Sequence, residues 1–244
     1  MRILYIVPGT MAQTDLGSKE LERRKNILQS HAQNDTVVEI TDLECGPTSI
    51  ESAYEEYLSV PETMKKTIQA EKDGFEGVIL GCFGDPGLVA LREMVSIPVV
   101  GSGETAMHVA ALLGRRFSIV TVLESVVPSL ERLARIVGLD QNLASVRAVD
   151  IPVLELRKNI KSSTRRMVEE SQKAIREDKA DVIVLGCMSM AFMEVSDKMQ
   201  ESLCIPVVNP ALAALKVLEG LVIAGLSHSK KAYPFPPPTR PTHS

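Results

Sequence analysis

Two cysteines follow two similar apolar runs of this chain. Cys82 comes after the run 78–81 (Val-Ile-Leu-Gly), and Cys187 comes after the run 182–186 (Val-Ile-Val-Leu-Gly). Short runs of β-branched and aliphatic residues that end in turn residues are typical of buried strands. Each strand would therefore deliver a thiol to one edge of a sheet. Two thiols that flank one ligand could act as base and acid on opposite faces of a single carbon and so invert it.

The turns after the two runs offer further help for proton transfer. A free cysteine has a pKa of about 8.5, and a helix N-terminus beside it lowers that value. Asp85 followed by Pro86 predicts such a helix start directly after Cys82. Since two thiolates would leave no acid, we expect the pair to titrate together as one thiolate and one thiol. Backbone N–H groups that could bind an oxyanion formed beside a carbonyl belong to Phe83, Gly84, Met188 and Ser189.

Short apolar runs alternate with helical segments, and the same order of elements occurs twice along the chain. The expected strands span 2–8, 37–40, 77–82 and 97–101, then 116–122, 145–149, 182–187 and 205–208. The expected helices span about 15–30, 86–94, 104–113, 125–137, 162–177 and 210–225, and Asp15 is expected to cap the first of them. A further helical stretch is expected between the second and third strands, with Pro61 at the start of its second half. This alternation predicts an α/β fold of two similar lobes with mainly parallel sheets flanked by helices. Pro98 indicates that the fourth strand lies at a sheet edge.

The repeat also predicts the domain organisation. The first lobe is expected over 1–102 and the second over 103–208, and the C-terminal helix and tail, 209–244, are expected to complete the first lobe. The proline-rich tail cannot extend a helix, so we expect a surface strap or disorder there. Ligands of open parallel sheets bind at the carboxyl ends of the strands, where both cysteines fall. We therefore expect the active site in a cleft between the lobes.

Composition excludes several classes of function. The 244 residues are 45% hydrophobic and 24% charged with a net charge of −4, and scattered lysines and arginines argue against a nucleic-acid partner. Because no apolar run suffices for a signal-peptide core or a membrane span, we expect a cytoplasmic protein without a membrane partner. The four cysteines form no C-x-x-C pair and have no adjacent histidine, so neither a metal site nor a disulfide scaffold is expected.

Three short motifs also carry a family resemblance. The segments 80–88 (Leu-Gly-Cys-Phe-Gly-Asp-Pro-Gly-Leu), 98–101 (Pro-Val-Val-Gly) and 185–187 (Leu-Gly-Cys) resemble the hydantoin racemase branch of the aspartate/glutamate racemase superfamily. The resemblance spans nearly the whole chain. It implies two pseudo-symmetric Rossmann-like lobes and cofactor-independent racemisation of 5-substituted hydantoins or of the related ureide allantoin. It also maps the two catalytic cysteines of that family onto Cys82 and Cys187.

Two departures from that family's pattern concern the substrate. The family's Asn-Pro-Asn-Ser/Thr motif corresponds here to 7–10 (Val-Pro-Gly-Thr), so both asparagines are missing. Where the family carries Ala-Gly after the second cysteine, this chain has Met188 and Ser189. Losing amide side chains that would meet a ring ureide suggests a different carbon acid, larger or less polar. The expected substrate contacts are Pro8, Thr10, Phe83, Gly84, Asp85, Thr121, Met188 and Ser189.

The sequence also leaves functions other than racemisation open. A cis–trans isomerase of the same superfamily would keep both cysteines and use one as a nucleophile, whereas a decarboxylase would keep only one. The segment 101–106 (Gly-Ser-Gly-Glu-Thr-Ala), with Glu124 about twenty residues on, matches the dinucleotide-binding pattern of an NAD-dependent oxidoreductase. That pattern belongs in the first βα turn of its domain, and here it falls at the lobe junction. A two-lobed binding protein without catalysis is a third class.

The expected partner is a small molecule, with no cofactor and no metal, and a homo-oligomer is left open. His108 and the pairs Arg115-Arg116 and Arg165-Arg166 are expected at the solvated surface. An acidic substrate would need a basic side chain in the cleft, and the sequence predicts none there.

Overall fold

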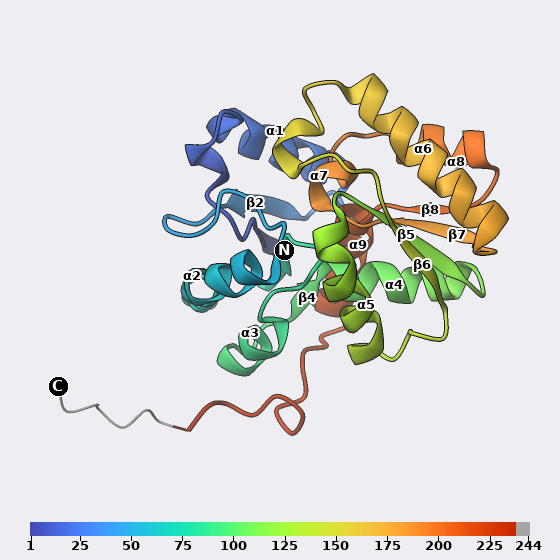
Figure 1. The fold of residues 1–244 in the computed structure, drawn as a ribbon. Helices are drawn as coiled ribbons and strands as arrows, with labels where there is room; N and C mark the ends of the chain where they lie inside the picture. The colour runs from blue at the N-terminus through green and yellow to red at the C-terminus, as the bar shows by residue number, and fades with distance from the viewer. Residues whose placement is uncertain (238–244) are drawn as a thin grey trace.

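Both halves of the chain form a four-stranded parallel sheet in the computed structural model, which describes residues 1–237 (Figure 1). In lobe 1, β1 (Arg2–Ile6) lies between β2 (Val37–Thr41) and β3 (Gly77–Leu80), and β4 (Val99–Gly101) forms an edge. In lobe 2, β5 (Phe117–Thr121) lies between β6 (Leu143–Ala148) and β7 (Val182–Leu185), and β8 (Val207–Val208) forms an edge. The shared strand order confirms the predicted pair of α/β lobes and the edge position that Pro98 indicated.

The helices follow the strands in both lobes. Lobe 1 contains α1 (Gly17–His31), α2 (Ala53–Lys72) and α3 (Leu88–Met94), and α4 (Ser102–Leu113) leads into lobe 2. Lobe 2 contains α5 (Val127–Ile136), α6 (Ile160–Glu177), α7 (Met188–Ala191) and α8 (Ser196–Leu203). Short 3₁₀ turns lie at η1 (Met11–Gln13), η2 (Glu124–Val126) and η3 (Val153–Glu155). Within residues 1–237, no helix is long and apolar enough to cross a membrane.

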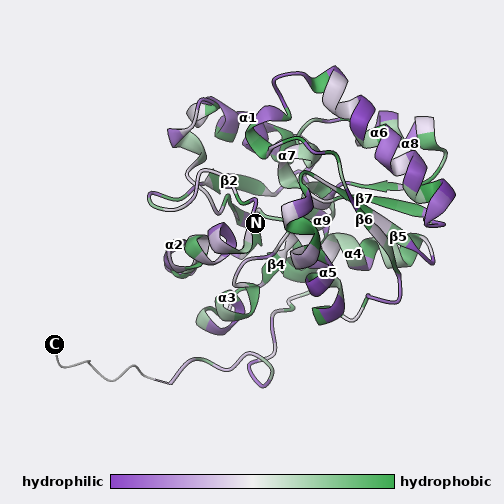
Figure 2. Cartoon of the chain, viewed as in Figure 1, coloured by the Kyte–Doolittle hydropathy of each residue, from purple (hydrophilic) through white to green (hydrophobic). Residues whose placement is uncertain are grey.

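The central strands are buried on both faces. Every residue of β3, β5 and β7 is buried, which explains why their sequences are continuous apolar runs without alternation. In β1, Ile3 and Tyr5 belong to one hydrophobic cluster while Leu4 and Ile6 belong to another on the opposite face. Figure 2 shows β7 as hydrophobic and the outer helix α6 as largely hydrophilic. The sheets therefore form rigid supports for the turns at their carboxyl ends.

The last helix, α9 (Pro210–Ile223), packs against lobe 1 after the chain has passed through lobe 2. Leu215 and Leu218 belong to the same cluster as Ile3 and Tyr5. A Cβ on Gly77 would lie 2.6 Å from the Leu218 side chain, so glycine in β3 permits this close approach. Residues 209–223 thus cover one face of the first sheet together with α1.

The segment after α9 runs over α3 and β4. The Lys230 ammonium donates to the carbonyl oxygens of Arg92, Glu93 and Val95 at 2.8, 3.2 and 2.6 Å. The Val99 N–H donates to His228 Nε2 at 2.8 Å. The described part of the tail is therefore tied to the end of α3, and residues 238–244 of the predicted strap lie outside the described residues.

Two local expectations were wrong, and two short helices were missed. Leu16 occupies the N-cap of α1 and no side chain caps that helix, so Asp15 does not. Pro61 does not open a new helical segment, because Ser52 caps α2 and the helix continues through Pro61, which is exposed to solvent. Helices α7 and α8 were not predicted, since segments of 4 and 8 residues carry too few turns for a clear periodicity.

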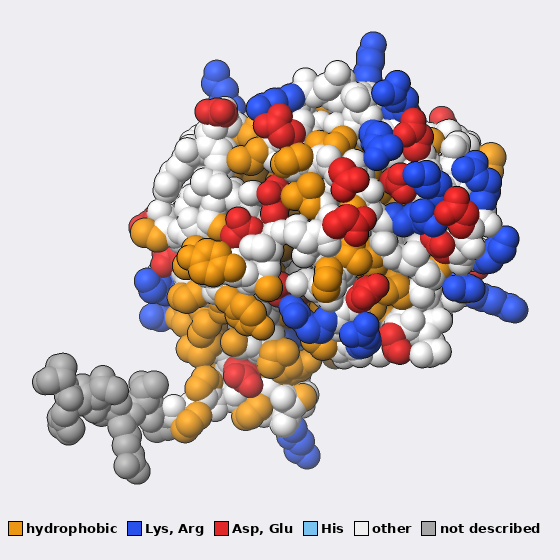
Figure 3. Space-filling model, in the orientation of Figure 1, with side chains coloured by type: hydrophobic (Ala, Val, Ile, Leu, Met, Phe, Trp, Pro, Cys, Tyr) orange, Lys and Arg blue, Asp and Glu red, His pale blue; other side chains and the backbone are white. Residues whose placement is uncertain are grey.

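Hydrophobic side chains gather at the surface over α2 and α3 on the face drawn in Figure 3. Exposed members of this patch are Tyr54, Tyr57, Leu58 and Val89. The patch lies on the outer side of lobe 1 and does not contribute to the inter-lobe cavity described next.

Candidate active site

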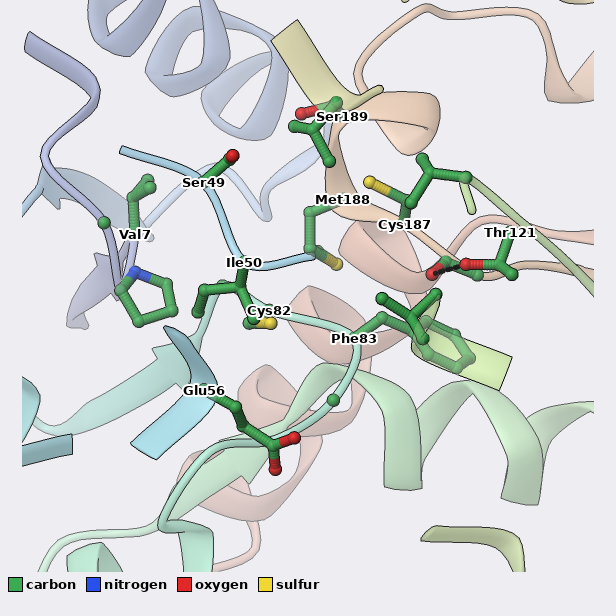
Figure 4. Close-up of a pocket in the computed structure, with 18 of the residues that line it drawn as sticks. Val7, Ser49, Ile50, Glu56, Cys82, Phe83, Thr121, Cys187, Met188 and Ser189 are labelled. Atoms are coloured by element: carbon green, nitrogen blue, oxygen red, sulfur yellow. Dashed lines mark hydrogen bonds between the residues drawn. The ribbon is translucent and has the colours of Figure 1, made fainter. Parts of the chain in front are cut away.

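A cavity of about 100 Å³ lies between the lobes at the carboxyl ends of the strands (Figure 4). The turns that follow β1, β3, β5 and β7 all contribute to its wall, as do loop 48–52, α1, α2 and η3. A cavity at this edge of the sheets, lined by both lobes, is the usual position for a small-molecule ligand. Both Cys82 and Cys187 line it, so the structure brings the two predicted thiols to one site.

The two cysteines occupy equivalent places, each two residues beyond the end of a central strand. A Cβ on Gly81 would lie 2.4 Å from the Tyr5 ring, and a Cβ on Gly186 would lie 2.5 Å from Ile119. Glycine before each cysteine therefore lets the strand end pack against its neighbour while the thiol turns into the cavity. Both cysteines are free and partly exposed.

The surroundings of Cys82 disfavour its thiolate. Burial raises the pKa of the Cys82 thiol above its ordinary value. The Gly84 N–H lowers this pKa, whereas the carboxyl groups of Asp85 and Glu56 raise it. A Cβ on Gly84 would lie 3.9 Å from Cys82 Sγ and 4.0 Å from the Glu56 carboxyl carbon, so the thiol and the acid both border Gly84.

Cys187 has a more favourable setting for negative charge. Burial again raises the pKa of the thiol, but the N–H groups of Ser189 and Met190 and the guanidinium of Arg24 lower it. The two sulfurs thus differ, with donors and a cation near Cys187 and carboxyl groups near Cys82. The groups around Cys187 therefore favour its thiolate, whereas the carboxyl groups around Cys82 oppose one there.

Asp85 does not begin a helix beside Cys82, and this corrects the expectation that such a helix lowers the pKa of Cys82. Its backbone is left-handed at φ 50°, and α3 begins only at Leu88 after Gly87. The Asp85 carboxylate instead accepts hydrogen bonds from the N–H groups of Gly103 and Glu104 at 3.1 and 2.6 Å. Asp85 therefore caps α4, and burial raises its own pKa to about 7.

The same contacts explain the glycine-rich segment 101–106. A Cβ on Gly103 would lie 1.9 Å from the Phe83 carbonyl oxygen, and a Cβ on Gly101 would lie 2.6 Å from the Asp85 carboxylate. The glycines are needed for close packing of α4 on the Cys82 turn. Because Asp85 already occupies the first N–H groups of α4, a dinucleotide pyrophosphate could not bind there as the pattern requires.

Six of the eight expected substrate contacts line the cavity, namely Pro8, Phe83, Gly84, Thr121, Met188 and Ser189. Thr10 and Asp85 do not. The buried Thr10 hydroxyl donates to the Pro47 carbonyl oxygen at 3.4 Å, and Asp85 caps α4 as described. The Thr121 hydroxyl donates to the Gly186 carbonyl oxygen at 3.1 Å, so it supports the turn that carries Cys187.

Two charged residues of the cavity were missed by the sequence analysis. Arg24 on α1 and Glu56 on α2 are the only charged side chains that line it within residues 1–237. Arg24 stands in the middle of α1 and Glu56 in the first turn of α2, both away from the cysteine motifs along the chain. Glu20 with Arg24 has the i, i+4 spacing of an ordinary surface pair. Only the burial of Glu20 and Arg24, at 3% and 1% exposed, distinguishes them. No group of three or more metal-binding side chains occurs in this same part of the chain.

The comparison with known proteins agrees with this architecture. The family described as Asp/Glu/Hydantoin racemase matches residues 19–218. A hydantoin racemase from Pseudomonas sp. (strain NS671) is 34% identical over 237 residues, which cover 97% of this chain and 92% of that protein. A hydantoin racemase from Rhizobium meliloti is 38% identical over 191 residues, 78% of each chain. The crystal structure of an allantoin racemase from Pseudomonas fluorescens superposes with a TM-score of 0.91 at 33% identity, covering 98% of this chain and 99% of that one.

Proposed function

The chain belongs to the Asp/Glu/hydantoin racemase family, and we propose that it inverts a carbon acid with Cys82 and Cys187 as its two acid/base residues and without a cofactor. The observation that supports this proposal is the placement of the two thiols at equivalent ends of two repeated sheets, on one cavity. A single thiol could remove a proton and return it to the same face. Two thiols from opposite lobes allow removal from one face and delivery to the other.

In the proposed reaction one cysteine is a thiolate and the other a thiol. The thiolate takes the proton from the stereocentre, the carbonyl next to it becomes an enolate, and the opposite thiol gives its own proton to the other face of the carbon. The charge returns to sulfur, so the cysteines exchange roles in each turnover. N–H groups of the two turns that are not bonded to sulfur, such as those of Phe83 and Met188, are suited to bind the enolate oxygen.

The different surroundings of the two thiols support one protonation state of the pair before the substrate binds. We infer that Cys187 carries the thiolate first, since its neighbours donate to sulfur, and that Cys82 is the first acid. The enantiomer whose hydrogen faces Cys187 is then bound by the resting enzyme directly, and its mirror image binds the form with exchanged protons.

We propose the substrate class from the relatives. Hydantoin-like or allantoin-like ring ureides carry the required hydrogen beside a carbonyl. Val7 and Gly9 replace the asparagines expected from the family pattern, so amide recognition of the ring is absent from this turn. A carbon acid with other polar groups is therefore included in the substrate panel.

Proton exchange in D2O tests the proposed function. A single enantiomer should lose its optical activity and gain deuterium at the stereocentre at matched rates, followed by polarimetry and proton NMR. Cys82→Ser and Cys187→Ser should each lower racemisation by at least ~10²-fold. Each variant should retain exchange only for the enantiomer that faces its remaining cysteine. Full racemisation by either variant would contradict the two-base mechanism, and a covalent adduct on one cysteine would favour cis–trans isomerisation.

A further inference from the structure

Arg24 is a buried cation in the wall of the cavity. Its side chain is 2% exposed, and it donates from Nε to Glu20 and from an Nη to Ser189, both at 2.9 Å. The guanidinium also lies 4.8 Å above the Phe192 ring centroid. These contacts hold the group in one place beside the turn that carries Cys187.

Glu20 does not fully neutralise the arginines around it. Arg23, Arg24 and Arg157 all donate to this one carboxylate. Arg23 has a second acid, Glu194, at 3.7 Å. Although burial opposes it, hydrogen bonds from Arg23 and Arg24 lower the pKa of Glu20 to about 2, so its single negative charge is permanent. Two acids thus face three arginines, and one positive charge is left over.

Of the three arginines, only Arg24 lines the cavity, whereas Arg157, whose Nε is buried without a partner, does not. A guanidinium has five N–H donors, and the bonds to Glu20 and Ser189 use two of them. No other acceptor for Arg24 lies within hydrogen-bond distance among residues 1–237. In the described part of the chain, no Arg24 nitrogen is both fully buried and without a partner, so its unused donors are accessible to a ligand in the cavity that Arg24 lines. A ligand carboxylate in the cavity would supply the missing acceptors in the geometry that arginine favours.

The other charged residue of the cavity already has a partner. Glu56 lies 3.6 Å from Arg132 across the lobe boundary. In Figure 4, Glu56 and Ser189 lie on opposite sides of the two cysteines. Uncompensated positive charge is therefore confined to the side of Ser189 and Cys187.

We propose that Arg24 determines substrate specificity by binding a carboxylate on the substrate, so that this chain acts on an anionic carbon acid instead of a neutral ring ureide. This inference rests on the proposed function, since it names the substrate class of the same cavity. The fixed cation would also stabilise the extra negative charge that develops when the thiolate removes the proton. Val7, which is buried and apolar, and Gly9 offer no side-chain donor to a neutral ring.

A matched pair of ligands tests this specificity. The probes are 5-benzylhydantoin and N-carbamoylphenylalanine, which share a side chain and a stereocentre, while only the second carries a carboxylate. Calorimetric titration of the wild type should give tighter binding of N-carbamoylphenylalanine. Arg24→Gln should weaken that binding roughly 10- to 100-fold, as expected for a lost hydrogen bond to a charged group, and leave hydantoin binding within about threefold. Arg24→Lys should restore part of the loss.

Arg23→Gln is the matched control, because Arg23 neighbours Arg24, shares Glu20 and does not line the cavity. It should change neither titration. Tighter wild-type binding of the hydantoin would overturn the proposal even if Arg24→Gln fails to fold. Equal weakening of both ligands by Arg24→Gln would assign Arg24 a structural role and overturn it too. Binding needs no turnover, so failure of deuterium exchange with intact carboxylate binding would reject the racemase mechanism and keep the carboxylate site.

Discussion

Replacing Asp85 by Asn should lower the pKa of the Cys82 thiol. The Asp85 carboxylate is buried, and it raises that pKa by its negative charge. Since the pKa of Asp85 itself is about 7, the group is ionised at the higher pH where the thiol titrates. Asn removes the charge, tolerates the left-handed φ of 50° and keeps one acceptor oxygen for the first turn of α4. We expect a downward shift on the order of one pH unit.

The assay is the pH dependence of alkylation by iodoacetamide, with Cys82 and Cys187 separated by peptide mass spectrometry. Asp181→Asn is the control, because Asp181 accepts from the N–H groups of Arg115 and Arg116 at 3.0 and 2.9 Å in a similar arrangement outside the cavity. It should leave the alkylation profile of Cys82 unchanged. A Cys82 midpoint that stays in place or rises in Asp85→Asn would refute the electrostatic account of the site.

Asp85→Asn should also change how the stability of the folded state depends on pH. The pKa of Asp85 is raised by burial from about 3.9 in the unfolded chain to about 7 in the folded one. The folded state therefore binds more protons between these values, and the stability from this group is complete below pH ~4 and is lost as the pH rises through 7. Thermal unfolding of the wild type should show this loss, and Asp85→Asn should flatten it. An unchanged pH slope in the variant would contradict the assignment.

Two further substitutions test the supporting structure. Gly103→Ala would place a Cβ 1.9 Å from the Phe83 carbonyl oxygen. Urea denaturation should therefore show a loss of more than ~3 kcal/mol in the free energy of unfolding, or no folded protein. An unchanged free energy of unfolding would show that α4 does not pack closely on the Cys82 turn. Lys230→Met should lower the free energy of unfolding by ~1–3 kcal/mol, because the ammonium bonds three carbonyl oxygens at the end of α3. The rate of racemisation should stay at the wild-type value. A loss of activity together with stability would instead connect the tail to the cavity.

The strands and the thiols were predictable from sequence because their signals are local. Each apolar run at 78–81 and 182–186 is short, is buried on both faces and ends in the glycine that its cysteine turn needs. Repetition of that pattern predicted two equivalent lobes, and the structure has the same strand order in both. Local patterns therefore sufficed for the fold and for the residues proposed to move protons.

The electrostatics of the site could not be predicted in this way, because they depend on partners distant in sequence. Asp85 appears in the sequence as a helix cap, but the helix that it caps, α4, begins 17 residues later at Ser102. Arg24 has the spacing of a surface ion pair, and only the folded chain brings it to Ser189, 165 residues away. Burial and tertiary contact decide the charge on such groups, and neither is encoded in a short window.

The packing of α9 on the first sheet imposes an order on assembly during synthesis. Translation delivers all strands of lobe 1 by residue 101, yet Leu215 and Leu218, which cover one face of that sheet, follow only after the whole of lobe 2. Lobe 2 can close its sheet with contiguous chain, whereas in lobe 1 α1 covers this face only beside β2, and the part beside β3 and β4 stays uncovered until residues 210–223 leave the ribosome. Such a partly bare sheet face invites association with other nascent chains. A chain that stops after β8 would therefore keep every strand and both cysteines and still lack the cover of its first lobe.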